Sequence, residues 1–207
     1  MPPSDHPARS IGFAKSRVES LTDGVFGFAM TLLVVGLVIP DSGSGSVSPP
    51  VQAILVALIP DFVHYAIAFF VLAGFWAAHH AQTEKLRFID RRFLWVNTIA
   101  LMFVALVPFS TSLAGDYPDI PLAAMVMEGN ILILGLIFAA QWRYATTEQR
   151  LVSSDLDVAA VAVGMQRNLV VPIISCLGIL LALAGITWST AVYLLVPLGM
   201  RIVRSGG

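Results

Sequence analysis

Charged and polar side chains gather at the start of the first long apolar segment of the chain. The sequence runs Arg17-Val-Glu-Ser-Leu-Thr-Asp23 and then continues through apolar residues to Ile39. A carboxylate at the edge of hydrocarbon is costly, so Asp23 is expected to face water, to have a polar partner, or both. Arg17 and Asp23 lie six residues apart, which is too far for a pair between residues i and i+4 of one helix. We therefore expect their partners on neighbouring helices, with His79 or His80 as the candidate.

This grouping of Arg17, Asp23 and a histidine has two interpretations. It is either a static polar staple between helices or a network that responds to pH through the histidine. A metal site is not expected, because adjacent residues on a helix point about 100° apart and His79 and His80 have no Cys or Glu at ligand spacing.

Glu128 is the other acidic residue well inside an apolar segment, and Gly129 and Asn130 follow it. It marks a polar crevice, a proton relay or a bond to a neighbouring helix, and all three readings stay open. The sequence has no Ser-His-Asp constellation, no pair of aspartates at helix centres and no Gly-rich phosphate loop. We therefore expect neither an enzyme nor a bound cofactor.

The elements that position these residues follow from composition. Of the 207 residues, 57% are hydrophobic and 12% are charged, and the mean hydropathy is +0.82. These values are typical of an integral membrane protein in a lipid bilayer, and apolar stretches of about 20 residues are long enough to cross it as helices. The pattern predicts an all-α protein with six transmembrane helices, at 18–39, 61–81, 92–113, 120–142, 169–186 and 188–203.

The orientation follows from the twelve Lys and Arg residues. They lie before or at the start of the first predicted span, between the second and third, between the fourth and fifth, and at the end of the chain, whereas the other three connections have none. Because cytoplasmic segments are enriched in basic residues, we expect a multi-pass protein of the cell membrane with both termini in the cytoplasm. The expected divisions are a tail over 1–16, a six-helix membrane domain over 17–204 and a second tail over 205–207. The formal net charge of −1 gives no reason to expect a nucleic-acid partner.

Three further features lie between or within these spans. The apolar residues 51–59 are too few to span, and they form either a short interfacial or re-entrant helix or an extension of the second span bent at Pro60. Residues 145–166 are predicted to form an amphipathic cytoplasmic helix. The only cysteine, Cys176, lies in the fifth apolar segment and is expected to be a small buried residue.

Four motifs, in order along the chain, resemble a known family. The pattern Arg-x-x-x-Phe-Ser-Asp, followed by an apolar helix with Thr-Leu-Leu, is the signature of the transmembrane protein 175 family of potassium channels. Here it reads Arg17-x-x-x-Leu21-Thr22-Asp23 with Thr31-Leu32-Leu33 following, so the chain departs from the family at the Phe and Ser positions. Phe75-Trp76-x-x-His79-His80, Asn97 and Pro108-Phe109 also resemble that family, and the likeness covers most of the first three predicted spans.

The resemblance implies a homotetramer in which the first helix of each subunit lines a central pore for K⁺. The sequence has no Thr-Val-Gly-Tyr-Gly filter loop, so ions would have to pass between copies of that helix or through its packed neighbours. The resemblance also implies a polar network that supports the pore helix, made of Arg17, Asp23, Trp76, His79, His80 and Asn97.

Helical spacing selects a pore face on the first span. Residues three, four and seven apart share one face of a helix, which groups Phe28 with Thr31, Leu32 and Val35. By resemblance, Phe28 occupies the family's narrowest hydrophobic constriction, where relatives usually carry Ile or Leu. The barrier of an apolar ring depends steeply on its radius, so conductance and selectivity are not carried over from the family. Thr31 either lines the pore or bonds back to the Gly27 carbonyl.

Two functions of different classes follow from these residues. The first-span motif favours a potassium-selective leak channel, whereas Glu128, Asp23 and the histidines favour a proton-coupled secondary transporter or a proton-conducting channel. Internal symmetry between the two halves of the chain would favour a transporter, but the motif from Arg17 to Asp23 has no counterpart near Leu169. A non-conducting membrane scaffold is a third reading.

Overall fold

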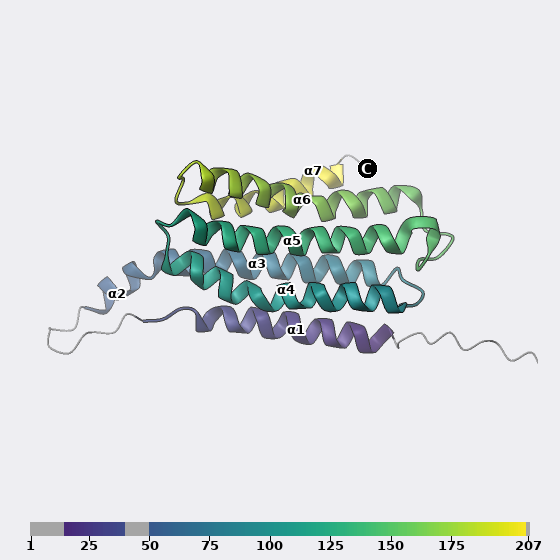
Figure 1. Ribbon diagram of the computed structural model, residues 1–207, viewed down its shortest axis with the longest axis horizontal. Coiled ribbons are helices and arrows are strands. Elements are labelled where there is room, and N and C mark those ends of the chain that lie inside the picture. Colours follow the sequence, from purple (N-terminus) through teal and green to yellow (C-terminus); the bar gives the residue numbers. More distant parts are fainter. Residues whose placement is uncertain (1–14, 40–49, 206–207) are drawn as a thin grey trace, which may run out of the picture.

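The computed structural model describes residues 15–39 and 50–205, and within them every regular element is a helix. Figure 1 shows the long helices running side by side along one axis. Most of the predicted N-terminal tail, the loop 40–49 and residues 206–207 lie outside the described residues. The elements in chain order are α1 Lys15–Val35, α2 Val51–Ala57, α3 Ile59–Thr83, α4 Arg91–Asp116, α5 Pro121–Thr146, η1 Thr147–Gln149, α6 Val158–Leu183, η2 Ser189–Leu195 and α7 Val196–Ser205.

Five of these helices, α1, α3, α4, α5 and α6, are long and apolar enough to cross a membrane. The first four agree with the predicted spans to within a few residues. The predicted sixth span, 188–203, is not one continuous α-helix, because residues 189–195 form the 3₁₀ helix η2 and α7 begins only at Val196. Pro197 explains the boundary, since proline is favoured in the first turn of a helix and disfavoured in its interior.

The segment before α6 also differs from the prediction. Residues 158–166 do not form a separate amphipathic helix but are the first turns of α6. The Asp157 side chain caps this helix by accepting a hydrogen bond from the Ala159 amide at 3.0 Å, so the helix starts where its first amides find an acceptor. Residues 51–57 form a short helix separated from α3 by Leu58.

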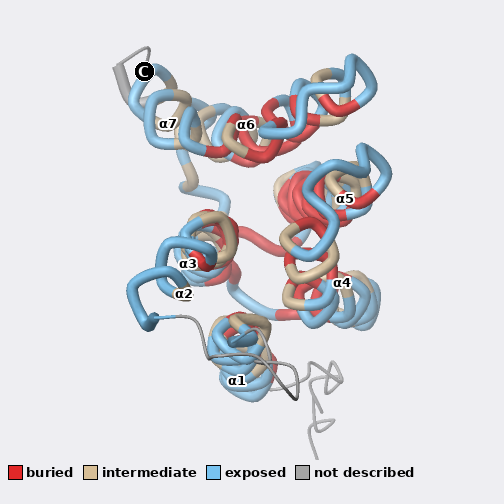
Figure 2. The backbone as a smooth tube through the Cα atoms, turned by 90° about the vertical axis from the view of Figure 1, so that its left-hand side faces the viewer, coloured by how far each residue is buried: buried red, intermediate tan, exposed pale blue. Residues whose placement is uncertain are grey.

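The bundle has α1 at one edge and α6 with α7 at the other, with α3, α4 and α5 between them, as the end-on view in Figure 2 shows. One hydrophobic core joins α1 to α3, α4, α5 and α6. Its fully buried side chains include Phe26 of α1, Leu72 of α3, Val104 of α4 and Leu134 of α5. The core therefore holds α1 along one side only.

Small residues bring α5 and α6 into close contact. A Cβ atom on Gly135 would stand 2.7 Å from Pro172 Cγ, and one on Gly164 would stand 2.8 Å from the Trp142 ring. Close approach over glycine is a common way of packing membrane helices. Cys176 of α6 is exposed rather than buried as predicted, because the buried positions next to it on α6 are 174, 175 and 178.

Basic residues mark one end of the bundle. Lys15, Lys85, Arg87 and Arg150 lie where α1 begins, where α3 leads into α4 and where α5 leads into α6, and these places share one end in Figure 1. The connections are tied together there, since Lys15 Nζ donates to the Leu86 carbonyl at 3.0 Å and the Arg87 amide donates to the Leu151 carbonyl at 2.8 Å. We call this the basic end, and the other the opposite end.

Candidate functional site

The two sides of α1 differ in burial. Its buried side chains are Val18, Thr22, Phe26, Ala29 and Leu33, spaced three or four residues apart, so they form one stripe along the helix. This stripe packs against α3 and α4. The rest of the helix surface is largely uncovered within a single chain, as the pale colour of α1 in Figure 2 shows.

Asn97 of α4 connects three other helices near the basic end. Its Oδ1 accepts hydrogen bonds from His79 Nε2 of α3 at 2.9 Å and from Gln141 Nε2 of α5 at 3.3 Å. Its Nδ2 donates to Thr22 Oγ1 of α1 at 3.0 Å. All four side chains are buried, so each hydrogen bond satisfies a group that has no access to solvent. Because the amide oxygen can only accept, His79 carries its proton on Nε2.

Asp23 is held by a different contact. Trp76 Nε1 of α3 donates a hydrogen bond to Asp23 Oδ1 at 2.8 Å. His80 stacks on the Trp76 ring with centroids 5.9 Å apart, and its Nε2 lies 3.4 Å from a carboxylate oxygen of Glu84. Asp23 is itself exposed, so it both faces water and has a partner, as its position at the edge of the apolar segment predicted.

Neither Arg17 nor Asp23 forms a hydrogen bond or ion pair with a histidine within the described residues, although the Asp23 charge acts on His79. Asp23 pairs with Trp76, and His79 is turned toward Asn97 in the interior. Arg17 is exposed and makes no hydrogen bond or ion pair within residues 15–39 and 50–205. His79 and His80 diverge to separate neighbours, and no group of three His, Cys, Asp or Glu residues in the described part of the chain is arranged to hold a metal ion.

The predicted pore face lies on the uncovered side of α1. Phe28 is 66% exposed and Val35 is 69% exposed, and Thr31 and Leu32 are also exposed. A groove of about 490 Å³ between α1 and α4 runs along this side, lined in part by Gly24, Phe28 and Leu32. In a membrane this surface must contact lipid, another copy of the chain, or a water-filled space.

The Thr31 hydroxyl bonds back to its own helix, although not to the carbonyl that was expected. Oγ1 donates to the Phe28 carbonyl at 2.7 Å rather than to Gly27. The bond uses the hydroxyl hydrogen and leaves the oxygen lone pairs facing away from the helix backbone. Back-bonding and an outward-facing oxygen acceptor are thus compatible at this position.

Two members of the polar network escaped sequence reasoning. Thr22 was noted only as a departure from the family pattern, and Gln141 was not singled out. The signal was present for both, since a polar residue in an apolar span usually faces another helix. The same signal applies to Asn168 of α6, whose Oδ1 accepts from Gln82 Nε2 of α3 at 2.7 Å.

Comparison with known proteins places these residues in a family. A family model described as endosomal/lysosomal potassium channel TMEM175 matches residues 17–108, the part that contains Asp23, Trp76 and Asn97. A potassium channel from Chamaesiphon minutus is 31% identical over 144 residues, which cover 68% of this chain and 70% of the relative. The endosomal/lysosomal proton channel TMEM175 of Homo sapiens is 30% identical over 162 residues, which cover 71% of this chain and 32% of the human protein.

The fold agrees over nearly the whole length of the chain. The crystal structure of a lysosomal potassium-selective channel TMEM175 homolog from Chamaesiphon minutus matches with a TM-score of 0.75 at 24% sequence identity, covering 91% of this chain and 97% of that one. The sequence match, the family model that begins at the first-span motif and the common helical fold lead to one conclusion. This chain belongs to the TMEM175 family.

Proposed function

We propose that the chain is a potassium-selective leak channel in which four copies assemble as a homotetramer and K⁺ passes down its gradient between their α1 helices. The uncovered side of α1 carries this proposal. Over its most apolar 18 residues α1 is 28% buried, whereas the corresponding stretches of the other four long helices are 39–44% buried. The helix that bears the family motif is therefore the one least covered by its own chain. The relative from Chamaesiphon minutus is named a potassium channel, which agrees with this assignment.

The constriction of this pore would be a ring of Phe28 side chains. An apolar ring stops ions by failing to replace their hydration, and the exposed phenyl groups supply that surface from each copy. Thr31 lies one turn further along α1, and its oxygen lone pairs are left for a partly dehydrated cation because its hydrogen is bonded to the Phe28 carbonyl. Leu32 and Val35 continue the apolar wall toward the opposite end.

The polar network would keep this face in place. Thr22 and Asp23 are adjacent in α1 and bond to Asn97 and Trp76 on two different helices, which fixes both the depth and the rotation of α1. The contacts of His79 are satisfied without a change of protonation. They favour the static staple over the pH-responsive network.

The basic end would face the cytoplasm, in the cell membrane, because basic segments are retained on that side. A sixth crossing is compatible with the last elements. The seven residues of η2 and the ten of α7, at rises of about 2.0 and 1.5 Å per residue, give roughly 29 Å, close to a hydrocarbon thickness of about 30 Å. Figure 1 places the start of α1 and the end of α7 at the same end of the bundle.

Flux from liposomes tests the channel proposal. Purified protein should release K⁺ down its gradient, faster than Na⁺, with no pH gradient imposed and with protons free to equilibrate. Cross-linking should give a tetramer. Correctly folded tetramers that show no K⁺ flux would falsify the proposal.

A proton-conducting channel or a proton-coupled transporter is the second candidate, favoured by the human relative, which is named a proton channel. The same liposomes separate the candidates. A transporter requires K⁺ movement strictly coupled to protons and lost in Glu128→Gln, whereas a leak channel keeps its K⁺ flux in that variant.

A further inference from the structure

Glu128 of α5 is buried without a hydrogen-bond partner among the described residues. Its side chain has no exposed area, and neither carboxyl oxygen has a hydrogen-bond partner among the described residues. The carboxyl group lies against Gly178 of α6, where a Cβ atom would stand 2.7 Å from Oε1. Glycine at 178 thus leaves the space that the carboxyl group occupies.

The groups that face Glu128 from η2 and α6 are neutral. Ser189 faces it from η2, and the Ser189 hydroxyl is also buried without a hydrogen-bond partner. Tyr193 of η2 approaches it too, but the Tyr193 hydroxyl is already paired with Ser175 Oγ of α6 at 2.9 Å. The carboxyl group and the Ser189 hydroxyl are therefore two neighbouring buried polar groups that lack a hydrogen-bond partner in this structure.

No basic group compensates Glu128. Asn130, two residues after Glu128 in α5, donates through Nδ2 to Ser110 Oγ and to the Phe103 carbonyl of α4, both at 3.3 Å, and all of these groups are neutral. None of the ion pairs within residues 15–39 and 50–205 includes Glu128. Of the titratable side chains on η2, α6 and α3, Tyr193 interacts with Glu128, Cys176 interacts with Tyr193, and His64 contacts Thr190, which follows Ser189 in the chain.

An ionised carboxylate in this position would be a buried charge with neither counter-ion nor donor. Such a charge costs far more than protonating the group, so the carboxyl takes up a proton instead. A neutral carboxylic acid carries one O–H donor, and the Ser189 oxygen is the acceptor within its reach. A bound proton would thus remove the charge that this packing of α5, α6 and η2 leaves uncompensated.

Polar side chains lie between this position and the opposite end of the bundle. Thr190, next to Ser189 in the chain, has its Oγ1 3.1 Å from His64 Nε2. His64 Nδ1 donates to the Pro60 carbonyl at 2.9 Å, so in the neutral ring Nε2 is the acceptor of the Thr190 hydroxyl. The two hydroxyls stand between a buried base and a buried acid.

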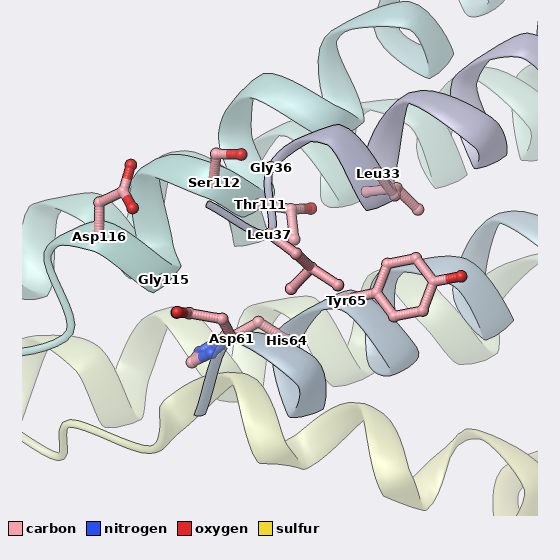
Figure 3. Close-up of a pocket in the computed structure, with 10 residues that line it drawn as sticks. All are labelled: Leu33, Gly36, Leu37, Asp61, His64, Tyr65, Thr111, Ser112, Gly115 and Asp116. Atoms are coloured by element: carbon pink, nitrogen blue, oxygen red, sulfur yellow. The ribbon is translucent and has the colours of Figure 1, made fainter. Parts of the chain in front are cut away.

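His64 also borders a small cavity, shown in Figure 3. The cavity has a volume of about 20 Å³, room for about one water molecule. Asp61 at the start of α3 and the exposed Asp116 at the end of α4 line it, together with Thr111, whose buried hydroxyl has no hydrogen-bond partner among the described residues. The cavity therefore has both the buried His64 and the exposed Asp116 in its lining.

We propose that Glu128 is a proton-binding site that holds its proton at neutral pH and exchanges it with the opposite end of the bundle through Ser189, Thr190 and His64. The site lies apart from α1 and the Asn97 network. It requires neither net proton transport nor K⁺ conduction, so it stands independently of the proposed function. Loss of the proton would place an uncompensated charge under η2 and loosen that element.

Infrared spectroscopy of the full-length protein in liposomes tests the bound proton directly. The chain has four glutamates, and the other three, Glu19, Glu84 and Glu148, have side chains at least 28% exposed. Carboxyl-¹³C labelling of glutamate should therefore shift one protonated-carboxyl band at pH 7, and Glu128→Gln should abolish that band. Absence of the shifted band from the wild-type protein would overturn the proposal, and this result does not depend on how the variant folds.

Transfer to D₂O tests the route. Deuteration moves the protonated-carboxyl band, and Thr190→Val should slow that movement by about tenfold or more, as expected when a positioned proton-transfer group is removed. Thr98→Val is the matched control, because Thr98 is exposed on α4 and bonds only to the Leu94 carbonyl at 2.9 Å. Equal deuteration rates in the two variants would overturn the route and leave Glu128 to exchange by another path.

Discussion

Replacing Asn97 by leucine tests whether the polar network fixes α1. Leucine has the same branching as asparagine, is somewhat larger and has no hydrogen-bonding group, so the change removes the hydrogen bonds without opening a cavity. The substitution leaves three buried polar atoms without their hydrogen-bond partner: Thr22 Oγ1, His79 Nε2 and Gln141 Nε2, whose residues are 1%, 5% and 3% exposed. Hydrogen bonds between membrane helices are worth about 0.6 kcal/mol on average and about 1.7 at most. Three bonds predict a loss of about 2 kcal/mol and an upper bound of about 5.

The measurement is the free energy of unfolding in mixed micelles titrated with denaturing detergent. A loss of about 2 kcal/mol lowers the folding equilibrium constant roughly thirty-fold. Thr98→Val, one residue further along α4, removes only an exposed hydroxyl and should change the free energy by less than about 0.5 kcal/mol. If Asn97→Leu and Thr98→Val have the same free energy of unfolding, the hydrogen bonds of Asn97 do not stabilise the contact between the four helices, and the reasoning from them is wrong.

Two further substitutions address the pore and the packing of α5 on α6. Phe28→Ala should raise K⁺ flux from liposomes and lower the preference for K⁺ over Na⁺, because it widens an apolar ring. The control is Val34→Ala, at an exposed position off the predicted pore face. Equal K⁺ fluxes in the two variants would show that Phe28 does not form the constriction. Gly135→Ala would place a Cβ atom 2.7 Å from Pro172 Cγ and should cost about 1–3 kcal/mol of unfolding free energy. Gly129→Ala, whose Cβ would meet no atom within 4 Å, should instead gain up to about 1 kcal/mol from helix propensity, so a similar effect of both changes would contradict the close contact.

Span length was the most predictable part of the fold, and its errors have local causes. Four spans follow from apolar length alone, because about 20 apolar residues cannot stay in water. The fifth helix begins earlier than its apolar residues predict, because the polar residues Gln166, Arg167 and Asn168 lie inside it and Asp157 is its cap. The predicted sixth span is divided between η2 and α7, because apolar composition does not show the effect of Pro197 on the backbone.

The partners within the site were less predictable than its members. Asp23, His79 and Asn97 were all identified, but which helix faces bring them together depends on rotations that no single span determines. Trp76 became the partner of Asp23 because the indole N–H lies beside the carboxylate, whereas His79 turns inward toward Asn97. A sequence shows which polar groups need partners, and packing decides the pairing.

The stripe by which α1 binds the bundle explains why a few polar contacts matter to its opposite side. Beyond Thr22 the stripe consists of Phe26, Ala29 and Leu33, and apolar contacts between membrane helices gain little over contacts with lipid tails. Such a stripe holds the helix close but specifies its rotation weakly. The directional bonds of Thr22 with Asn97, and of the adjacent Asp23 with Trp76, set that rotation. Phe28 follows Thr22 by six residues, roughly 9 Å along the same helix. If α1 rotates after the bond to Asn97 is lost, the Phe28 ring changes direction with it. Asn97→Leu should therefore alter K⁺ flux as well as stability.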